Sequence, residues 1–508
     1  MVIMATPLHC SETTAKPRVA VVSSPGMGHI IPLLELAKRL ATDHGCHVSF
    51  LNITTQASAA QTKLLNSTEF PPNFHVINLP EVDVSKLIPP DSQIMTRLSI
   101  IVQESFRCLK SVLLDIGKPD ALIIDLFSSH AFEVCKELSI PVYSFDTAST
   151  TLLSLSLYLL TLDKEIDSDI EFVNLPEPIR VPGCTPIRTE DLLDQVRKRK
   201  SEECKWYLLH ISRIPMAAGV LLNTWEDLEP ITLKAIRENP YYHNKASIVT
   251  PPIYTVGPLI KETEPITESG NECLAWLDNQ PPDSVVFVAL GSGGTVTSEQ
   301  LNEIAWGLEM SGQRFVWVVR APTEFDASGT FFNVGGDIND PKSFLPDGFL
   351  ERTKEVGYVV SSWAPQSAVL RHRSTGAFLS HCGWNSIVES LSQGVPMIAW
   401  PLYAEQKMNA TILVEEVGVA VKLAVDLRKG IVTREEIKRA VSLVINNGGN
   451  DDDDEEEEEE ERNLGKVLRL KARKLKLSAE KALRKDGGSS YDSLTQLTND
   501  LMVSRISS

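Results

Sequence analysis

Residues 363–406 read WAPQSAVLRHRSTGAFLSHCGWNSIVESLSQGVPMIAWPLYAEQ, and the middle of this stretch decides the fold. The apolar residues 377–379 are typical of the end of a buried strand, a tight turn follows through Gly383, and a helix is expected to begin near Trp384. The first turn of such a helix leaves backbone N–H groups unpaired at the positive end of the helix dipole. The sequence therefore predicts an anion-binding site at this strand–helix junction.

Several side chains around this junction could bind one extended ligand. His381 and Ser386 add hydrogen-bond donors to the anion site, as a diphosphate requires. Glu389, one turn further along the helix, would be repelled by phosphate and suits neutral hydroxyls such as those of a ribose. Trp363 offers a flat apolar platform for a base, and residues 405–406 offer an acceptor and an amide to sugar hydroxyls.

The whole stretch resembles the 44-residue signature box of the plant secondary-product UDP-glycosyltransferases, matched from its first Trp to its last Gln without a gap. An ordinary buried strand–helix unit would explain the apolar positions but not the pattern HCGWNSxxE. The resemblance implies a UDP-sugar as donor substrate, with no metal ion and no further cofactor. The residues expected to bind the UDP-sugar are Thr147, Ser292, Trp363, Ala364, Gln366, His381, Trp384, Asn385, Ser386, Glu389, Tyr403, Ala404, Glu405 and Gln406.

Glycine-rich strand–turn–helix units open both halves of the chain. The first reads RVAVVSS, PGMGH and IIPLLELAKRL from residue 18, and the second reads SVVFVAL, GSGGT and a helix over 298–311. Strands that alternate with helices imply a parallel sheet covered on both faces. We therefore predict an α/β protein with two Rossmann-like domains that face a cleft, and the resembled family has this architecture, the GT-B fold.

Composition suggests the domain boundaries. Residues 1–250 are expected to form an N-terminal acceptor-binding domain with a mainly helical region from 152 to about 239. The Pro-rich residues 251–260 are expected as a linker, and 261–485 as the UDP-sugar-binding domain. For residues 486–508 we expect a helix, which the resemblance places back on the N-terminal domain.

His29 and Asp125 are the expected catalytic residues. His29 closes the first glycine turn at a helix start, on the sheet edge where ligands bind in such folds, and the helix dipole favours its neutral form. Asp125 ends the run ALIID and should reach the same edge, where a buried carboxylate can orient an imidazole. In the resembled family the histidine of PGMGH deprotonates the acceptor hydroxyl. A surface histidine and a helix N-cap are the alternatives, and Asp146 competes with Asp125 for the orienting role.

Two other motifs are less specific. LGSGGT follows the strand expected at 284–290, and its Ser292 is placed to touch a diphosphate oxygen. It is not the GxGxxG dinucleotide fingerprint, since the third glycine and a later ribose-binding acid are missing, which disfavours a nicotinamide-dependent dehydrogenase. The DSD at 167–169 imitates a metal-binding motif but lies in a polar stretch, and we interpret it as a loop.

The bulk composition is that of a globular protein. At 508 residues, with 43% hydrophobic and 23% charged residues, the chain suggests two large domains. Scattered cysteines fit a reducing compartment without structural zinc, and neither a secretory signal nor an apolar run long enough for a bilayer is evident. The net charge of −18 argues against nucleic acid, and its eleven-acid run at 451–461 is interpreted as a solvated loop rather than an interaction tail. We expect a cytoplasmic monomer without stable membrane insertion.

The predicted function is an inverting, UDP-glucose-dependent O-glucosyltransferase that converts small phenols into β-glucosides. Segments such as GLEMSGQRFVWVVRAP and LPDGFLERT resemble the hydroquinone and phenylpropanoid glucosyltransferase group, which implies hydroquinone-like phenols, phenylpropanoids, monolignols and flavonoids as acceptors. DLFSSHAF departs from that group's pattern and leaves the acceptor open. The alternatives are transfer to nitrogen or carbon of an aromatic acceptor, and a non-catalytic UDP-sugar-binding protein, which should have lost His29 or Asp125.

Overall fold

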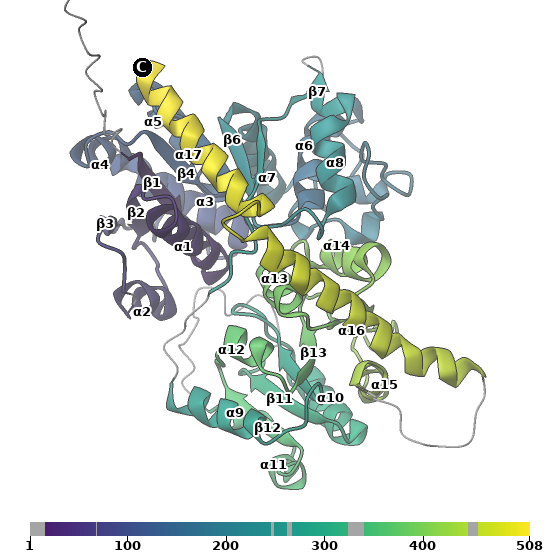
Figure 1. Cartoon of the computed structure of the whole chain (residues 1–508). Coiled ribbons are helices and arrows are strands. Elements are labelled where there is room, and N and C mark those ends of the chain that lie inside the picture. Colours follow the sequence, from purple (N-terminus) through teal and green to yellow (C-terminus); the bar gives the residue numbers. More distant parts are fainter. Residues whose placement is uncertain are drawn as a thin grey trace, which may run out of the picture.

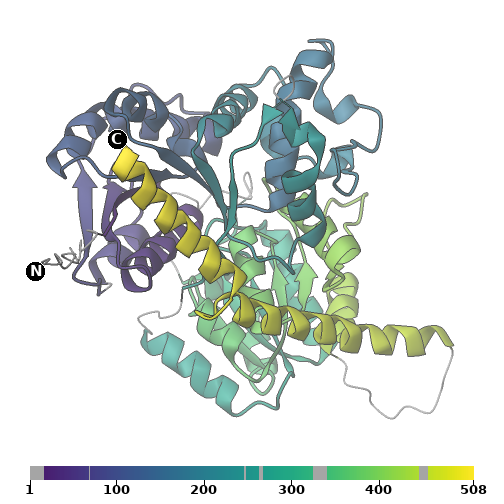
Figure 2. The same cartoon turned by 45° about the horizontal axis from the view of Figure 1, so that its top comes forward.

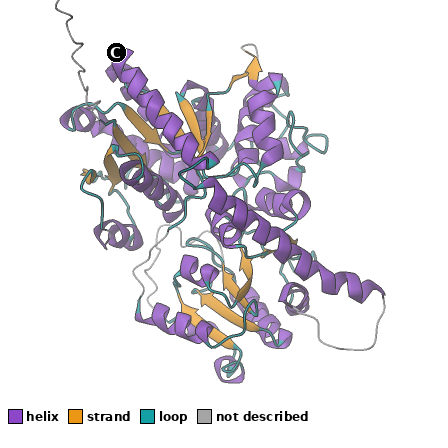
Figure 3. Ribbon diagram, viewed as in Figure 1, coloured by secondary structure: helices purple, strands orange, loops and turns teal. Residues whose placement is uncertain are grey.

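The computed structural model describes residues 16–67, 69–244, 248–261, 267–323, 340–445 and 456–507. Within these ranges the chain forms two parallel β-sheets that belong to separate domains, and Figure 1 shows them one above the other. Helices surround both sheets (Figure 3). The predicted pair of Rossmann-like α/β domains is thus what the chain forms.

The first sheet has the strand order β3-β2-β1-β4-β5-β6-β9, with every neighbouring pair parallel. Its central strands are runs of Val, Ile and Leu that are buried on both faces, as parallel sheets under helices require. The strands are β1 (Arg18–Ser23), β2 (His47–Ile53), β3 (Phe74–Leu79), β4 (Ala121–Ile124), β5 (Val142–Asp146), β6 (Gly219–Leu222) and β9 (Ile253–Thr255).

Eight described helices and a small hairpin complete this domain. The helices are α1 (Met27–Thr42), α2 (Ala59–Ser67), α3 (Ile94–Ser105), α4 (Leu109–Asp115), α5 (Ala131–Leu138), α6 (Thr150–Glu165), α7 (Glu202–Ser212) and α8 (Pro230–Glu238). The hairpin pairs β7 (His243–Asn244) with β8 (Ile248–Val249). The region expected to be mainly helical has α6, α7 and α8, but residues 166–201 between the first two form turns, short 3₁₀ segments and one antiparallel bridge between Ile179 and Ile187.

The second sheet has the order β12-β11-β10-β13-β14-β15, again entirely parallel. Its strands are β10 (Val285–Ala289), β11 (Arg314–Val319), β12 (Gly357–Ser361), β13 (Thr375–Ser380), β14 (Met397–Ala399) and β15 (Ala420–Lys422). Its helices are α9 (Glu268–Asp278), α10 (Ser298–Ser311), α11 (Phe349–Arg352), α12 (Gln366–Arg371), α13 (Trp384–Gln393), α14 (Gln406–Thr411), which continues as a π-helical segment (Ile412–Val417), and α15 (Arg434–Ile445).

The chain end joins the two domains. Helix α16 (Glu456–Ala482) packs on α13 of the second domain, and α17 (Ser489–Ser507) then runs back over the first, as the yellow helices of Figure 2 show. Leu494, Leu497 and Leu501 of α17 are buried in the same apolar cluster as α1 and β1. Tyr254 of β9 also donates a hydrogen bond to Asp500.

Two expectations about connecting segments differ from the structure. Residues 253–255, inside the expected linker 251–260, form β9 by pairing with the edge of β6, and Val256 and Leu259 after it are buried in the apolar cluster of the first domain. Part of the acidic run lies outside the described residues, but 456–461 belong to α16 rather than to a loop. Glutamate is a good helix former and is favoured near a helix N-terminus. The Gly- and Asn-rich content of residues 325–341 predicts a surface loop, but this segment lies almost wholly outside the described residues. Across the described ranges, no helix is long and apolar enough to cross a membrane.

Candidate functional site

The strand order reverses beside the first strand of each sheet, between β1 and β4 and between β10 and β13. At such a switch point a crevice forms outside the carboxyl ends of parallel strands, and ligands bind there. Residues that follow all four strands line one cavity of about 300 Å³ between the two domains. The candidate site is therefore built from both switch points at once.

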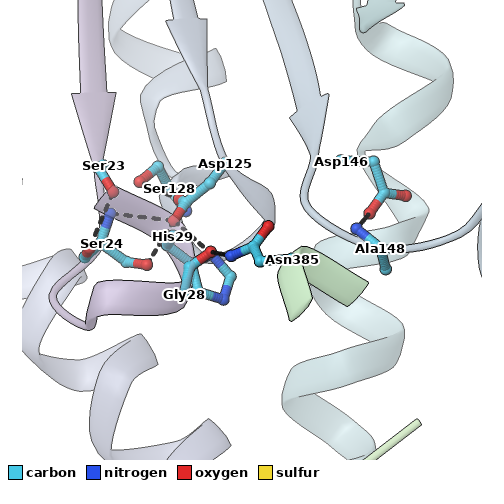
Figure 4. Close-up of polar contacts among 9 residues, drawn as sticks. All are labelled: Ser23, Ser24, Gly28, His29, Asp125, Ser128, Asp146, Ala148 and Asn385. Atoms are coloured by element: carbon cyan, nitrogen blue, oxygen red, sulfur yellow. Dashed lines mark hydrogen bonds and ion pairs between the residues drawn. The ribbon is translucent and has the colours of Figure 1, made fainter. Parts of the chain in front are cut away.

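His29 lies in the first turn of α1, just after the glycine turn that follows β1. Its Nδ1 lies 3.0 Å from Oδ2 of Asp125, as Figure 4 shows. This contact is not ideally directed for an N–H donor, but among the described residues no other polar atom pairs with Nδ1. With Nδ1 turned to Asp125, Nε2 is left for the cavity that His29 lines. The ring also meets Phe127 edge-on, with 5.1 Å between centroids.

Asp125 is fully buried and receives hydrogen bonds on both carboxylate oxygens. Oδ2 accepts from the backbone N–H of Ser24 at 3.0 Å and from the Ser24 hydroxyl. Oδ1 accepts from the backbone N–H and the hydroxyl of Ser128, at 3.1 and 2.6 Å. Burial by itself would raise the pKa of Asp125, but its contacts with His29, Ser128 and Ser24 outweigh burial and hold the pKa below its ordinary value.

Asp125 thus serves both arrangements considered from the sequence. It is the N-cap of a short 3₁₀ turn (Leu126–Ser128), and it also contacts the imidazole of His29. A carboxylate that stays charged at neutral pH can hold a neutral imidazole with its proton on Nδ1 and can stabilise the imidazolium that forms after proton uptake. The arrangement can therefore support a general base at Nε2.

On the opposite wall, helix α13 begins at Trp384 without a side-chain cap on its first turn. An uncapped N-terminus of this length attracts an anion through its N–H groups and dipole. His381 lies between two glycines, since a Cβ at Gly291 or at Gly383 would come within 2.5 Å of its ring. Burial lowers the pKa of His381 to about 4, so the ring is neutral at pH 7 and offers one N–H donor.

The rest of this wall is a set of linked polar groups. Gln366 Nε2 donates to Glu389 Oε2 at 2.8 Å and to Ser386 Oγ at 3.1 Å. Gln406 Oε1 accepts from two successive backbone N–H groups, those of Leu402 and Tyr403, at 2.9 and 3.0 Å. The Gln406 oxygen is therefore engaged within the protein, and its NH₂ group is the part that can face a ligand. The Gln406 amide, which was expected to offer its whole group to sugar hydroxyls, thus has only its NH₂ group free to do so.

Two residues of this wall also join the domains. Asn385 Nδ2 donates to the backbone oxygen of Gly28 at 2.7 Å (Figure 4), and Trp384 Nε1 donates to the backbone oxygen of Asn223 at 2.9 Å. The first bond connects the start of α13 to the residue before His29. These two bonds fix the start of α13 relative to the first domain, where α1 begins across the cavity.

The structure gathers the residues expected from the sequence in one place. His29 and all fourteen residues expected at the UDP-sugar site, Thr147 included, line the cavity, whereas Asp125 lies behind His29 and does not reach the surface. The DSD segment is a loop, and its Asp169 pairs with Lys200 at 2.8 Å. Among the residues described, no three His, Cys, Asp or Glu side chains meet as metal ligands.

Sequence reasoning missed several residues of the cavity. Arg320, at the end of β11, donates to the backbone oxygens of Gly291 and Ser292 and so supports the glycine turn. Tyr207 and Gln195 come from a region with no motif to mark it. Asp146 was considered only as a rival to Asp125; its place at the end of β5 could have identified it as a cavity residue by the same switch-point argument.

Comparison with known proteins agrees with this geometry. Residues 249–452 match the family described as UDP-glucoronosyl and UDP-glucosyl transferase. The chain is 42% identical to anthocyanidin 3-O-glucosyltransferase 5 of Manihot esculenta, over 96% of both chains. It is 41% identical to the hydroquinone glucosyltransferase of Rauvolfia serpentina, over 93% of this chain and 95% of that one.

Among solved structures, the crystal structure of TcCGT1 in complex with UDP is 44% identical and superimposes with a TM-score of 0.85, over 96% of this chain and 100% of that one. The expected GT-B fold is confirmed, as is the resemblance to the group that includes the hydroquinone glucosyltransferase. UDP-sugars are the donor substrates in this family.

Proposed function

We propose, from the finding that this chain belongs to the UDP-glucuronosyl and UDP-glucosyl transferase family, that its donor is UDP-glucose and its acceptors are small phenols. Membership makes the chain an enzyme that transfers a sugar from a UDP-sugar to small acceptor molecules. The observation that carries the finer proposal is the His29–Asp125 pair, which meets the uncapped start of α13 across a single cavity.

The proposed reaction needs only groups that line this cavity. Nε2 of His29 takes the proton of the acceptor hydroxyl, and the charged Asp125 stabilises the resulting imidazolium. The acceptor oxygen forms a bond to the anomeric carbon as the bond from that carbon to the diphosphate oxygen breaks, so the configuration inverts. The negative charge on the leaving UDP is stabilised by the N-terminus of α13 and by the neutral His381 donor.

The donor residues take the roles expected from the sequence. We assign the diphosphate to His381, Ser386 and Ser292, and the ribose to Glu389 with its partner Gln366. The base lies on Trp363, whose side chain is partly exposed beside the cavity. The remaining UDP-sugar residues, which support these groups or face the sugar, are Thr147, Ala364, Trp384, Asn385, Tyr403, Ala404, Glu405 and Gln406.

An aromatic acceptor suits the wall that the first domain contributes. Ile94, Leu98, Phe127, Leu152 and Leu193 line it and give it an apolar, flat-sided character beside His29. Two similar proteins are named for phenols, anthocyanidin and hydroquinone, and both are named as glucosyltransferases. These names support a phenolic acceptor and a glucose donor for this chain.

The test is product formation by the purified enzyme with UDP-glucose or UDP-galactose and a panel of phenols, monolignols and flavonoids. We expect an acid-labile β-glucoside, identified by mass spectrometry and by the anomeric proton coupling. Equal catalytic efficiency with both sugars would refute the glucose assignment. An acid-stable product would show transfer to carbon, and the absence of product with every phenol would refute the acceptor class.

We also propose the domain division and the setting of the enzyme. Residues 1–250 bind the acceptor, 261–485 bind the UDP-sugar, and 486–508 return to the first domain, with residues 251–252 and 256–260 connecting the halves around β9. The seven described cysteines are free thiols, which supports a reducing, cytoplasmic setting. A monomer would elute from size-exclusion chromatography with light scattering near 56.1 kDa.

A further inference from the structure

Asp146 occupies a position in the cavity that the proposed reaction leaves unused. It ends β5, the strand beside β4, so its carboxylate emerges at the same sheet edge as Asp125, one strand further along (Figure 4). Neighbouring strands lie roughly 4.8 Å apart. Unlike Asp125, Asp146 is only partly buried and lines the cavity directly.

The surroundings of Asp146 are those of the acceptor wall. Among the described residues of the first domain that line the cavity, Asp146 is the one carboxylate; most of the others are apolar. Its Oδ1 accepts from the backbone N–H of Ala148 at 3.1 Å. Its Oδ2 has no protein hydrogen-bond partner within the described part of the chain. A carboxylate oxygen that faces an apolar cavity without a partner is suited to a hydrogen-bond donor on a ligand.

The charges around Asp146 are unfavourable for an anionic acceptor. Glu405 faces it from the second domain and Tyr207 faces it from α7, while His29 lies across the first sheet edge. The one arginine of the described lining, Arg320, is held against Gly291 and Ser292 at the diphosphate end. Burial chiefly, and then repulsion by Glu405, raise the pKa of Asp146 to about 6, so the group is charged at pH 7.5.

We propose that Asp146 determines acceptor specificity: it accepts a hydrogen bond from a second hydroxyl of the acceptor and excludes acceptors that carry a carboxylate in that place. The inference rests on the proposed function, since it assumes that a phenolic oxygen lies at His29. A phenol bound there extends along the apolar wall toward the end of β5. A hydroxyl on that part of the ring meets Oδ2 of Asp146, whereas a carboxylate there meets the charged Asp146 with Glu405 beyond it, and the one arginine of the described lining is held at the diphosphate end.

The experiment uses three phenols that differ in one group: hydroxybenzyl alcohol, methylphenol and hydroxybenzoate, each as the meta and the para isomer. At pH 7.5 and saturating UDP-glucose, kcat/KM of the wild type should be highest for an alcohol and lowest for the benzoates. Asp146→Asn keeps an oxygen for the Ala148 N–H but removes the charge. This variant should raise the ratio of kcat/KM for benzoate to kcat/KM for methylphenol about tenfold or more, which corresponds to about 1.4 kcal/mol. It should lower the ratio of kcat/KM for the alcohol to kcat/KM for methylphenol.

Asp169→Asn is the matched control, because Asp169 is exposed and its ion pair with Lys200 lies on the surface. The dissociation constants of the same acceptors are also measured by calorimetry with UDP bound, and their ratios are compared in the same way. This measurement requires no turnover. Ratios in Asp146→Asn equal to those of the wild type would overturn the proposal, as would a rise in the KM for UDP-glucose with unchanged acceptor ratios, which would place Asp146 at the sugar. If the wild type turns over none of the phenols, the proposed function is refuted. The ratios of the acceptor dissociation constants in the wild type and in Asp146→Asn would still decide the role of Asp146.

Discussion

Replacing Asp125 by Asn is the sharpest test of the catalytic pair, because it changes one atom of a carboxylate whose every contact is a donor. Two of these donors, the backbone N–H groups of Ser24 and Ser128, approach different oxygens and cannot reverse their role. An asparagine has one oxygen and one NH₂ group, so one of the two N–H groups must face NH₂. A buried donor left in this way costs about 1–3 kcal/mol.

The two orientations of the amide damage catalysis differently. If the NH₂ group faces Ser128, His29 keeps its proton on Nδ1, but the imidazolium loses its negative partner. If the NH₂ group faces Ser24 and His29, the ring must turn its unprotonated Nδ1 toward it and carry the proton on Nε2, where it cannot act as a base. Either result removes general base catalysis, so we expect kcat to fall about 10²- to 10⁴-fold.

The assay compares kcat, the calorimetric affinity for UDP and the melting temperature. Asp125→Asn should lose turnover, melt a few degrees lower and bind UDP as the wild type does, since the proposed UDP site lies on the other domain. Asp278→Asn is the control, because it makes the same change in a second His–Asp pair, formed with His372 at 3.1 Å on the surface. A folded Asp125→Asn enzyme that keeps more than a tenth of wild-type kcat would refute the reasoning.

Four further predictions follow from individual groups. His29→Ala should abolish transfer to phenols with UDP affinity retained, and a parallel loss of UDP binding would contradict its place on the acceptor side. Gln406→Glu preserves the oxygen that accepts two backbone N–H groups but loses the NH₂ donor, so kcat/KM for UDP-glucose should fall while the Kd for UDP stays unchanged. Deletion of 451–461 should leave kcat and melting temperature unchanged, because the apolar contacts of α16 lie further along the helix; a lower melting temperature would show that the run is structural. The pKa of Asp146 is raised to about 6, so the stability that its protonated form contributes is full below pH 4 and is lost as the pH rises through 6. The free energy of unfolding of Asp146→Asn should therefore exceed that of the wild type by up to ~3 kcal/mol at pH 7.5 but not at pH 4. Thermal unfolding at both pH values measures this difference.

The strand–turn–helix units were predictable from sequence because their signals are local. Helix α10 has the expected bounds, Ser298–Ser311, and begins directly after its Thr297 cap, while the apolar run Arg314–Val319 that follows it forms β11. The site followed from the same signals, because residues that come directly after a parallel strand must lie at its carboxyl edge. Asp125 and His381 are of this kind, and His29 lies at the start of the helix that follows β1.

Other features depend on contacts between distant segments and leave no local pattern. β9 is a short strand in a Pro-rich stretch, and it is a strand because β6 offers it an edge. The engagement of Gln406 Oε1 by two backbone N–H groups depends on the turn before α14, which spacing alone does not define. Tyr207 reaches the cavity because α7 packs on α3 and α6, a tertiary arrangement that polar turns between 166 and 201 make hard to foresee.

The position of the base is coupled to the donor site through one hydrogen bond. Asn385 is the second residue of α13, whose N-terminus we assign to the diphosphate, and its amide holds the backbone oxygen of Gly28, the residue before His29. A rotation of the second domain away from the first would therefore break this bond and withdraw both the anion site and a support of the imidazole. Alignment within about an ångström is needed for efficient transfer between bound groups. The signature box thus positions the donor and, through Asn385, also helps to position the base contributed by the other domain.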